Sequence, residues 1–302
     1  MRRHLHQLMA CLLLALPLTA AAADAPPLRV VATFSILADM VREVGGPAVE
    51  VASLVGPDAD AHVFTPTPAD ARRVASADLV VVNGLRYEGW IERLVRASGY
   101  RGPVLVASEG IVPRRVGGSA DPHAWQSLAN AKVYVENIRA ALVAAAPARR
   151  SEIDARAADY LRRIAALERD TIARIAKLPV QQRRVITSHD AFGYFAAAYG
   201  IEFVSARGWS TDGEPSAEAV ARLIRHARAL RASALLVENI SDPRLIERIA
   251  REAGLAVGGA LYSDALSPPG TAADTYLRLF AHNVHTLVEA IEQARPESPT
   301  KP

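Results

Sequence analysis

The sequence predicts an α/β protein with two lobes, each built on a mostly parallel sheet flanked by helices, and joined by one long, rigid linker helix. The first observation is an alternation of short apolar runs with amphipathic helical patterns, which is typical of parallel sheets covered on both faces. The second is that this alternation occurs twice, before residue 127 and again after residue 178. The third is the longest helical pattern of the chain, which lies between the two halves.

Four apolar runs in the first half of the chain have the length of buried strands. They occupy residues 28–34, 50–55, 79–84 and 103–108. Helical patterns separate them, and one begins at Thr67 and Pro68, which suit a helix N-cap and a first helical turn. We therefore expect residues 24–146 to form an N-terminal α/β lobe.

The helical pattern at the centre of the chain predicts the linker. Leu128, Ala131 and Val135 begin an apolar stripe whose members are three or four residues apart. Pro147 interrupts the pattern, because proline disfavours helix at the residue before it and suits a first helical turn. The pattern then resumes, so we expect a linker helix over residues 147–178, about 45 Å long at about 1.5 Å per residue.

The strand and helix pattern restarts after the linker. Further strands are predicted at residues 183–188, 202–206 and 234–239, and a fourth within residues 257–266. Residues 179–302 are therefore expected to form a C-terminal α/β lobe. A linker of this length would hold the lobes at a nearly fixed angle, with a cleft between them.

The first residues predict export to the periplasm. Arg2 and Arg3 precede an apolar run of signal-peptide length, and Ala21 and Ala23 supply the small residues of a cleavage site. We expect a signal peptide over residues 1–23 that is cleaved, since the run is too short and too early for a membrane anchor.

Cys11, the single cysteine of the chain, leaves a second possibility for this segment. The residues before it resemble the motif of a lipid-modified cysteine, but most of the apolar run follows Cys11 instead of preceding it. Cleavage after Ala23 leaves a mature chain without thiols, so a metal site would use nitrogen and oxygen ligands.

Composition narrows the classes of function. Half of the residues are hydrophobic and 22% are charged, as in a globular chain. The net charge is +3, and the basic residues are scattered over predicted helix faces. We therefore expect no binding to nucleic acids.

Three histidines and one aspartate form the candidate metal site. His62, His123 and His189 lie in loops or directly after predicted strands, and Asp264 is placed in the same way. Ligands of open α/β sheets gather beyond the carboxyl ends of the strands, so two residues from each lobe could meet in the cleft. A lone loop histidine is more often a surface residue, so the spacing is compatible with a metal site and with separate surface histidines. Bulky apolar residues that could exclude water lie nearby, at Phe64, Trp125, Phe192 and Tyr262.

Several longer stretches of the chain form an ordered series of motifs. They are VGPDADAHVFTPTPAD, ADLVVVNGLRYEGW, DPHAWQSLANAKVYVENI, VITSHDAFGYFAAAYG, and LYSDAL followed by TYLRLFAHNV. This series resembles bacterial ABC-transporter solute-binding proteins of the zinc- and manganese-binding cluster, over essentially all of the mature chain. The resemblance implies four metal ligands at His62, His123, His189 and Asp264, and a fold of two α/β lobes joined by one long helix.

The chemical types of the four implied ligands indicate which metal the site prefers. Manganese-type members of the family usually have glutamate at the third position, where this chain has His189. Imidazole suits zinc, whereas manganese prefers oxygen-rich sites, so we expect Zn(II), with Mn(II) or Fe(II) as the alternatives. One departure is the short segment before His123, which lacks the histidine-rich loop of many zinc-type members.

The resemblance also implies a function. It predicts a periplasmic, high-affinity metal-binding component of an ABC importer, which captures Zn(II) in the cleft and delivers it to a membrane permease. A periplasmic metallochaperone is a further candidate partner, and we expect a monomer without enzymatic activity.

Two other functions were weighed against this prediction. In a zinc hydrolase the three histidines would hold the metal, a water would take the fourth position, and Asp264 would act as base. The chain has neither an HExxH nor a GxSxG motif. Surface attachment, described for some members of the family, would need an anchor that the sequence does not provide.

Other polar residues have less certain roles. Glu238, at the end of a predicted strand, either contacts the cleft or orients a ligand, and the pattern does not decide between these roles. Glu214 is expected to be structural, and Asp60 is either a turn residue or a recruiter of cations. His282 and His285 lie one turn apart on the last helix, which permits a second metal site, although packing or exposure is the expected role.

Overall fold

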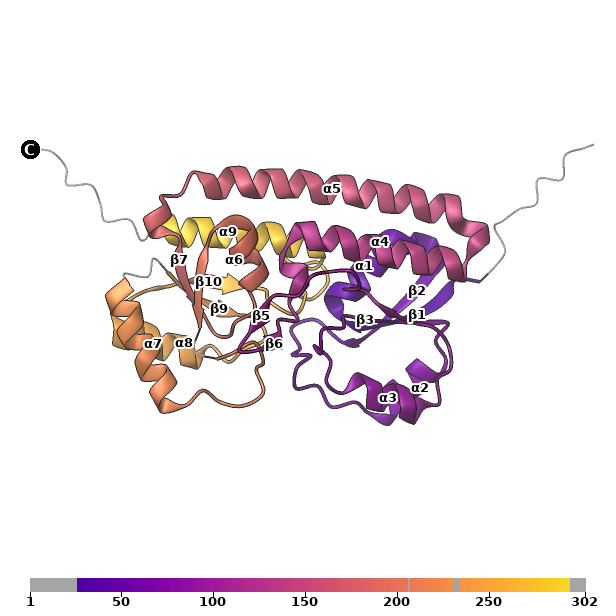
Figure 1. Ribbon diagram of the computed structural model, residues 1–302, viewed down its shortest axis with the longest axis horizontal. Helices are drawn as coiled ribbons and strands as arrows, with labels where there is room; N and C mark the ends of the chain where they lie inside the picture. Colours follow the sequence, from indigo (N-terminus) through magenta and orange to yellow (C-terminus); the bar gives the residue numbers. More distant parts are fainter. Residues whose placement is uncertain (1–25, 206, 231–233, 294–302) are drawn as a thin grey trace, which may run out of the picture.

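A computed structural model describes residues 26–205, 207–230 and 234–293. The predicted signal peptide and Cys11 lie outside the described residues. Within the described ranges, every helix is too short or too polar to cross a membrane. The molecule is elongated, with one sheet and its helices at each end (Figure 1).

The first lobe contains a four-stranded sheet in the order β2-β1-β3-β4, and all of its neighbouring strands are parallel. Its strands are β1 (Leu28–Phe34), β2 (Val49–Val55), β3 (Leu79–Val82) and β4 (Val104–Val106). Its helices are α1 (Ser35–Gly45), α2 (Pro68–Ala75), α3 (Ile91–Ser98) and α4 (Leu128–Ala145). Thr67 caps α2 as predicted, in a capping box with Asp70.

The second lobe repeats the plan with a parallel sheet in the order β10-β9-β7-β8. Its strands are β7 (Arg184–Thr187), β8 (Glu202–Ser205), β9 (Ala234–Glu238) and β10 (Val257–Leu261). Its helices are α6 (Gly193–Tyr199), α7 (Ala217–Leu230), α8 (Arg244–Ala253) and α9 (Tyr276–Gln293). The fold class therefore matches the prediction.

A short antiparallel hairpin precedes His123. It pairs β5 (Arg115–Val116) with β6 (Ser119–Ala120), and both central turn residues, Gly117 and Gly118, have positive φ. Two-residue hairpin turns need this backbone conformation, which glycine adopts without strain. The hairpin is followed by the 3₁₀ turn η2 (Ala124–Gln126).

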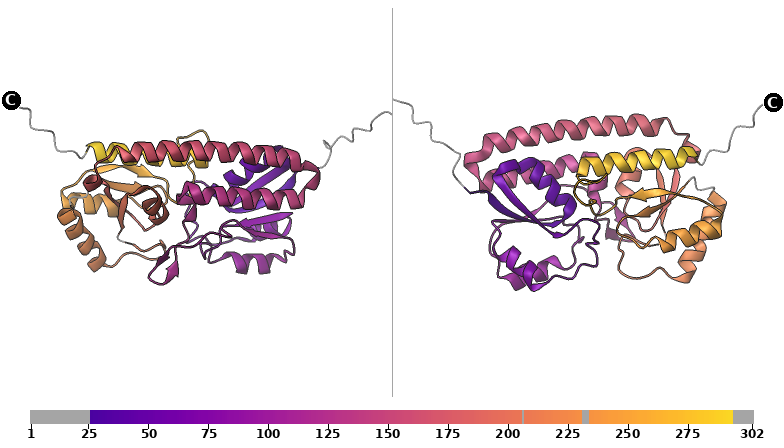
Figure 2. Two further views of the ribbon diagram at one scale, coloured as in Figure 1. Left: turned by 45° about the horizontal axis from the view of Figure 1, so that its top comes forward. Right: turned by 180° about the vertical axis from the view of Figure 1, so that it is seen from behind.

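The linker helix is α5 (Arg150–Ala176), 27 residues or about 40 Å long. The chain reverses at a turn over Pro147–Arg149, so α4 and α5 pack side by side (Figures 1 and 2). The helical pattern predicted the break at Pro147 but not this reversal. Helix α5 also packs against α1 of the first lobe and α9 of the second.

The buried apolar residues form one large cluster that includes both lobes and the linker. It contains Val80 and Leu37 from the first lobe, Tyr160 from α5, and Leu261 and Phe280 from the second lobe. A smaller cluster lies where α7 and α8 cover the second sheet. Because close-packed interiors resist deformation, this continuous core favours a fixed angle between the lobes.

Candidate metal centre

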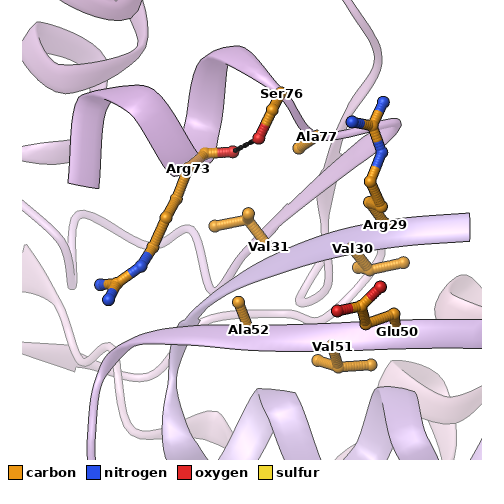
Figure 3. Close-up of a pocket in the computed structure, with 9 residues that line it drawn as sticks. All are labelled: Arg29, Val30, Val31, Glu50, Val51, Ala52, Arg73, Ser76 and Ala77. Atoms are coloured by element: carbon orange, nitrogen blue, oxygen red, sulfur yellow. Dashed lines mark hydrogen bonds between the residues drawn. The ribbon is translucent and has the colours of Figure 1, made fainter. Parts of the chain in front are cut away.

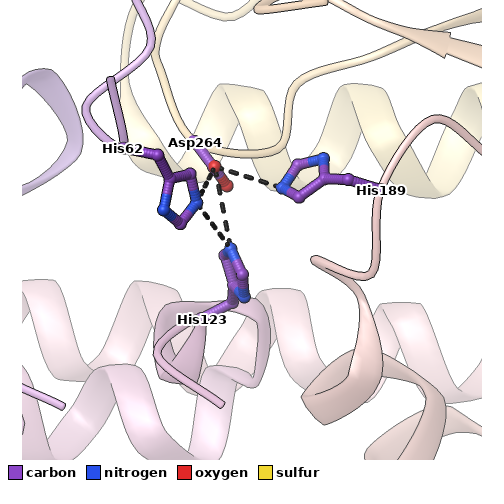
Figure 4. A group of neighbouring side chains, drawn as sticks. All are labelled: His62, His123, His189 and Asp264. Carbon is purple, nitrogen blue, oxygen red and sulfur yellow. Dashed lines mark hydrogen bonds and ion pairs between the residues drawn. The ribbon is translucent and has the colours of Figure 1, made fainter. Parts of the chain in front are cut away.

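The four predicted ligands lie together between the lobes (Figure 4). His62 is in the loop after β2, and His123 lies between β6 and η2. His189 directly follows β7, and Asp264 is in the loop after β10. Three of the four therefore follow strand ends, where an open parallel sheet leaves side chains free to meet.

The distances between the candidate ligand atoms match a small coordination shell. Oδ2 of Asp264 lies 3.1 Å from Nε2 of His62, 3.7 Å from Nε2 of His123 and 3.3 Å from Nε2 of His189. The Nε2 atoms of His62 and His123 are 3.3 Å apart, and all four ligand atoms lie within 4.8 Å of one another. A tetrahedron with bonds of about 2.0–2.1 Å has edges of roughly 3.3 Å, so one ion fits between these atoms.

Asp264 is fully buried, and the polar atoms that face its Oδ2 atom are the Nε2 atoms of the three histidines. Burial alone would raise the pKa of Asp264, but the positive charges of His123 and His189 lower it well below its usual range. A buried carboxylate is costly unless positive charge neutralises it, and protonated imidazoles or a bound metal ion can supply that charge here. This observation favours a metal ion at the centre of the group.

A carboxylate orients the imidazole of His123. Asp121 accepts a hydrogen bond from the backbone N–H of His123 at 3.0 Å and lies 2.9 Å from its Nδ1 atom. Arg114 donates to the second oxygen of Asp121 at 2.7 Å. Burial opposes the charged imidazole, yet the charges of Asp264 and Asp121 raise the pKa of His123 to about 9. The Asp121 contact directs Nε2 towards the centre.

Glu238 supports His189 in the same way. Its Oε2 atom lies 2.6 Å from Nδ1 of His189, and its Oε1 atom accepts from the backbone N–H of His189 at 2.9 Å. Burial again opposes the charged ring, but the charges of Glu238 and Asp264 raise the pKa of His189 well above its usual range. Between the two roles that the sequence left open for Glu238, the structure favours orientation of a ligand.

His62 is supported through its backbone. Asp60 accepts a hydrogen bond from the backbone N–H of His62 at 2.8 Å and a second from the hydroxyl of Thr211 at 2.5 Å. In the described part of the chain, the carboxylate that faces the ring of His62 is that of Asp264. Burial lowers the pKa of His62 despite that carboxylate, and the charges of His123 and His189 act in the same direction. Asp60 is therefore a turn residue that also bridges the lobes.

Aromatic rings enclose the candidate site. Tyr87 packs edge-on against His62 at 4.7 Å between ring centroids, and Trp125 packs against His123 at 5.3 Å. Trp209 lies 6.0 Å from His62. Trp125 was predicted in this role. The other three predicted residues make their ring contacts elsewhere: Phe64 with Trp90, Phe192 with Phe203 and Tyr262 with His282.

The remaining candidates lie outside this group. Glu214 is largely exposed and pairs with Arg207, in keeping with a structural role. His282 contacts the carbonyl of Ala260, while His285 pairs with Glu289, so the two rings have separate partners. Within the described ranges, the group of His62, His123, His189 and Asp264 is the one with metal-binding geometry.

Two supporting residues were missed by sequence reasoning, Asp121 and Tyr87. Asp121 stands two residues before His123, and an acidic residue so close to a ligand is a usable signal. Tyr87 is 25 residues from His62 along the chain, and no local pattern connects them.

A hollow of about 170 Å³ lies away from the ligand group (Figure 3). Arg29 and Glu50 line it near the amino ends of β1 and β2, with Arg73 and Ser76 from the region of α2. Ligands of this architecture bind at the opposite, carboxyl ends of the strands. The hollow therefore does not compete with the ligand group as the functional site.

Comparison with known proteins agrees with the geometry. Residues 30–290 match the family model described as the periplasmic component A of the zinc-uptake complex. The iron-binding protein YfeA of Yersinia pestis is 32% identical over 274 residues, covering 88% of this chain and 86% of that protein. The manganese-binding lipoprotein MntA of Bacillus subtilis is 32% identical over 275 residues, covering 88% and 90%.

Solved structures resemble the whole fold. The periplasmic zinc-binding protein TroA of Treponema pallidum superposes with a TM-score of 0.85 at 28% identity, covering 88% of this chain and 99% of that one. A manganese-bound periplasmic metal-binding protein of Candidatus Liberibacter asiaticus gives a TM-score of 0.79 at 28% identity, covering 87% and 99%. The chain therefore belongs to the periplasmic zinc-uptake component A family, and relatives of the chain include proteins named as substrate-binding lipoproteins of metal ABC transporters.

Proposed function

We propose that this periplasmic component of a metal ABC transporter captures Zn(II) with His62, His123, His189 and Asp264 and delivers it to a membrane permease. The observation that carries the proposal is the fully buried Asp264 carboxylate, whose Oδ2 atom faces three imidazole Nε2 atoms at 3.1–3.7 Å. One divalent ion at this point neutralises the carboxylate and satisfies all three nitrogens.

The choice of Zn(II) follows from ligand chemistry. Three nitrogens and one carboxylate in a near-tetrahedral arrangement suit zinc better than manganese, which prefers more oxygen ligands. Relatives are named for iron, manganese and zinc, so their names do not select the metal. Mn(II) or Fe(II) is the alternative cargo, and a second oxygen from Asp264 would favour either of them.

The proposed site serves transport and not catalysis. A catalytic zinc keeps one position for water or substrate, whereas four protein ligands would leave no such position on a tetrahedral ion. The hydrolase alternative would need Asp264 to stand off the ion as a base, yet its Oδ2 atom lies 3.1–3.7 Å from the three Nε2 atoms and within the same 4.8 Å group.

The remaining parts of the proposal concern the whole chain. We place signal-peptide cleavage after residue 23, the lobes at 24–146 and 179–302, and the linker at 147–178. The mature protein is a monomer that meets the permease and, before it, a periplasmic metallochaperone. The continuous core across the lobes supports release through small movements of the ligand loops instead of a large hinge rotation.

Elemental analysis of protein purified from the periplasm tests the choice of metal. We expect one zinc per chain, retained against a large excess of Mn(II) in a competition titration. Replacement by Co(II) should give the visible spectrum of a closed, four-coordinate site with three nitrogens. Manganese that displaces zinc at equal concentration would contradict the proposed cargo, and an exchangeable water on Co(II) would favour the hydrolase.

A further inference from the structure

Two ligands from opposite lobes are joined by hydrogen bonds that do not involve the ligand atoms. The backbone carbonyl of Ser263, directly before Asp264, accepts from Nε1 of Trp125 at 3.0 Å and from Nε2 of Gln126 at 2.7 Å. Trp125 and Gln126 follow His123 by two and three residues, in the turn η2. We call the contact of Trp125 and Gln126 with Ser263 the strap.

The strap is anchored in both lobes. On the first lobe, Nδ2 of Asn83 at the end of β3 donates to the carbonyl of Pro122 at 2.9 Å, just before His123. On the second lobe, the hydroxyl of Tyr276 at the start of α9 donates to the carbonyl of Trp125 at 2.6 Å. The turn η2 is therefore held from both sides, and His123 and Asp264 are held with it.

All parts of the strap are shielded from water. Trp125 and Ser263 are 0% exposed, and Gln126 is 1% exposed. Separation of Ser263 from η2 would leave a buried carbonyl and two buried N–H donors without partners, which is costly. Because of this cost, we expect the strap to persist when no metal is present.

We propose that Gln126, together with Trp125, is a positioning residue that keeps His123 and Asp264 opposed across the lobes before the ion arrives. This inference rests on the proposed function of the site. Pre-organisation of two ligands from different lobes reduces the ordering that metal binding must complete, so it slows metal loss. Gln126 is suited to the task because its amide reaches the carbonyl of Ser263 while its stem stays in the apolar turn.

The test compares Gln126→Met with Asn137→Ala. Methionine keeps the length and bulk of Gln126 but has no donor. Asn137 donates through its side-chain amide to the carbonyls of Ala107 and Glu109, both at 2.9 Å, within the first lobe and outside η2, so its loss is an amide deletion that leaves the strap intact. Dissociation of Co(II) into excess chelator should be about five- to tenfold faster in Gln126→Met, and within twofold of wild type in Asn137→Ala.

A second measurement tests the strap whether or not wild-type protein retains metal. Exchange of the Trp125 indole hydrogen is followed by NMR in the metal-free protein, with the signal assigned through Trp90→Phe and Trp209→Phe. We expect the indole to remain protected in wild type and to exchange at least tenfold faster in Gln126→Met. An unprotected Trp125 indole in metal-free wild type would overturn the strap. So would equal metal-loss rates for Gln126→Met and Asn137→Ala. Failure of wild type to bind metal, with the indole protected, would instead overturn the proposed function.

Discussion

The three histidines of the candidate site differ in what lies behind their rings. His123 and His189 each have a carboxylate at Nδ1, from Asp121 and Glu238, and both pKa values are raised. His62 is held by its backbone, and burial lowers its pKa. The surroundings in the metal-free protein therefore favour a proton on each of the first two rings and disfavour one on the third.

This difference gives His123 and His189 a role in the site that His62 does not share. A carboxylate at Nδ1 fixes the orientation of an imidazole ring and makes its Nε2 atom a stronger metal ligand. His123 and His189 are therefore the more rigidly positioned ligands. His62 lies in the loop after β2 and is held by the contact of its backbone N–H with Asp60. We infer that an incoming ion displaces protons from the two backed rings.

The largest expected effect of the difference between the rings is the pH dependence of metal affinity. An imidazole must lose its proton to bind, and each protonated ring lowers affinity about tenfold per pH unit below its pKa. With two backed rings protonated, affinity should fall by up to about 10⁴-fold between pH 8 and pH 6. The measurement is a competition titration with a chelator at each pH. A loss that begins only below pH 6.5, the ordinary value for histidine, would contradict the raised pKa values.

Removal of one backed ring should have the next largest effect. Four ligands share a binding free energy of about 10–16 kcal/mol in structural zinc sites, so one ligand accounts for roughly 10²- to 10³-fold in affinity. We expect His189→Ala to weaken zinc binding by this factor in isothermal titration. The matched control is His285→Ala on the exposed side of α9, which should leave affinity unchanged. Equal affinities of the two variants would remove His189 from the site.

The supporting carboxylates offer a direct test of the comparison. Glu238→Gln and Asp121→Asn should each reduce zinc affinity by about 10- to 100-fold, because the ring loses its charged partner but keeps its place. Asp60→Asn near His62 should cost no more than about threefold, since it alters hydrogen bonds from two neutral donors, the backbone N–H of His62 and the hydroxyl of Thr211, and neither involves the ring. Comparable losses for Asp60→Asn and Glu238→Gln would show that the three rings are supported alike.

The raised pKa of His123 should also affect thermal stability, and this effect should be smaller than the effects on affinity. The raised pKa of His123 stabilises the metal-free fold fully below pH 6.5, and this contribution is lost as pH rises towards 9. Zinc binds only the folded form and competes with fewer protons at high pH. The increase in Tm on adding zinc should therefore grow between pH 6.5 and pH 9, as differential scanning fluorimetry can measure. A shrinking increase would contradict this linkage.

Much of the fold was predictable because it depends on local periodicity. The alternation of strands and helices predicted two parallel sheets, and the pattern around Tyr160 predicted the long helix. The reversal at Pro147 was not predictable, since a proline marks where a helix breaks but not the direction that the chain takes next. That direction depends on packing of α4 against α5, which unites residues far apart in sequence.

The candidate site was predictable to a different extent. Histidines after strand ends, together with the family motifs, pointed to all four residues that the structure brings together. Some supports are contacts across long separations, such as Glu238 with His189 and Thr211 with Asp60, and no sequence pattern relates their members. Asp121 and Asp60 instead stand two residues before the ligands that they support. Gln126 resembles any polar residue at the start of a helix until Ser263 is seen beside it.

The most direct test of the account is a crystal structure of the zinc-loaded protein with anomalous scattering at the zinc edge. We predict a single ion at about 2.0–2.2 Å from Nε2 of His62, His123 and His189 and from a carboxylate oxygen of Asp264. Zinc bound elsewhere, or bound without Asp264, would contradict the central claim that two ligands from each lobe close around one ion.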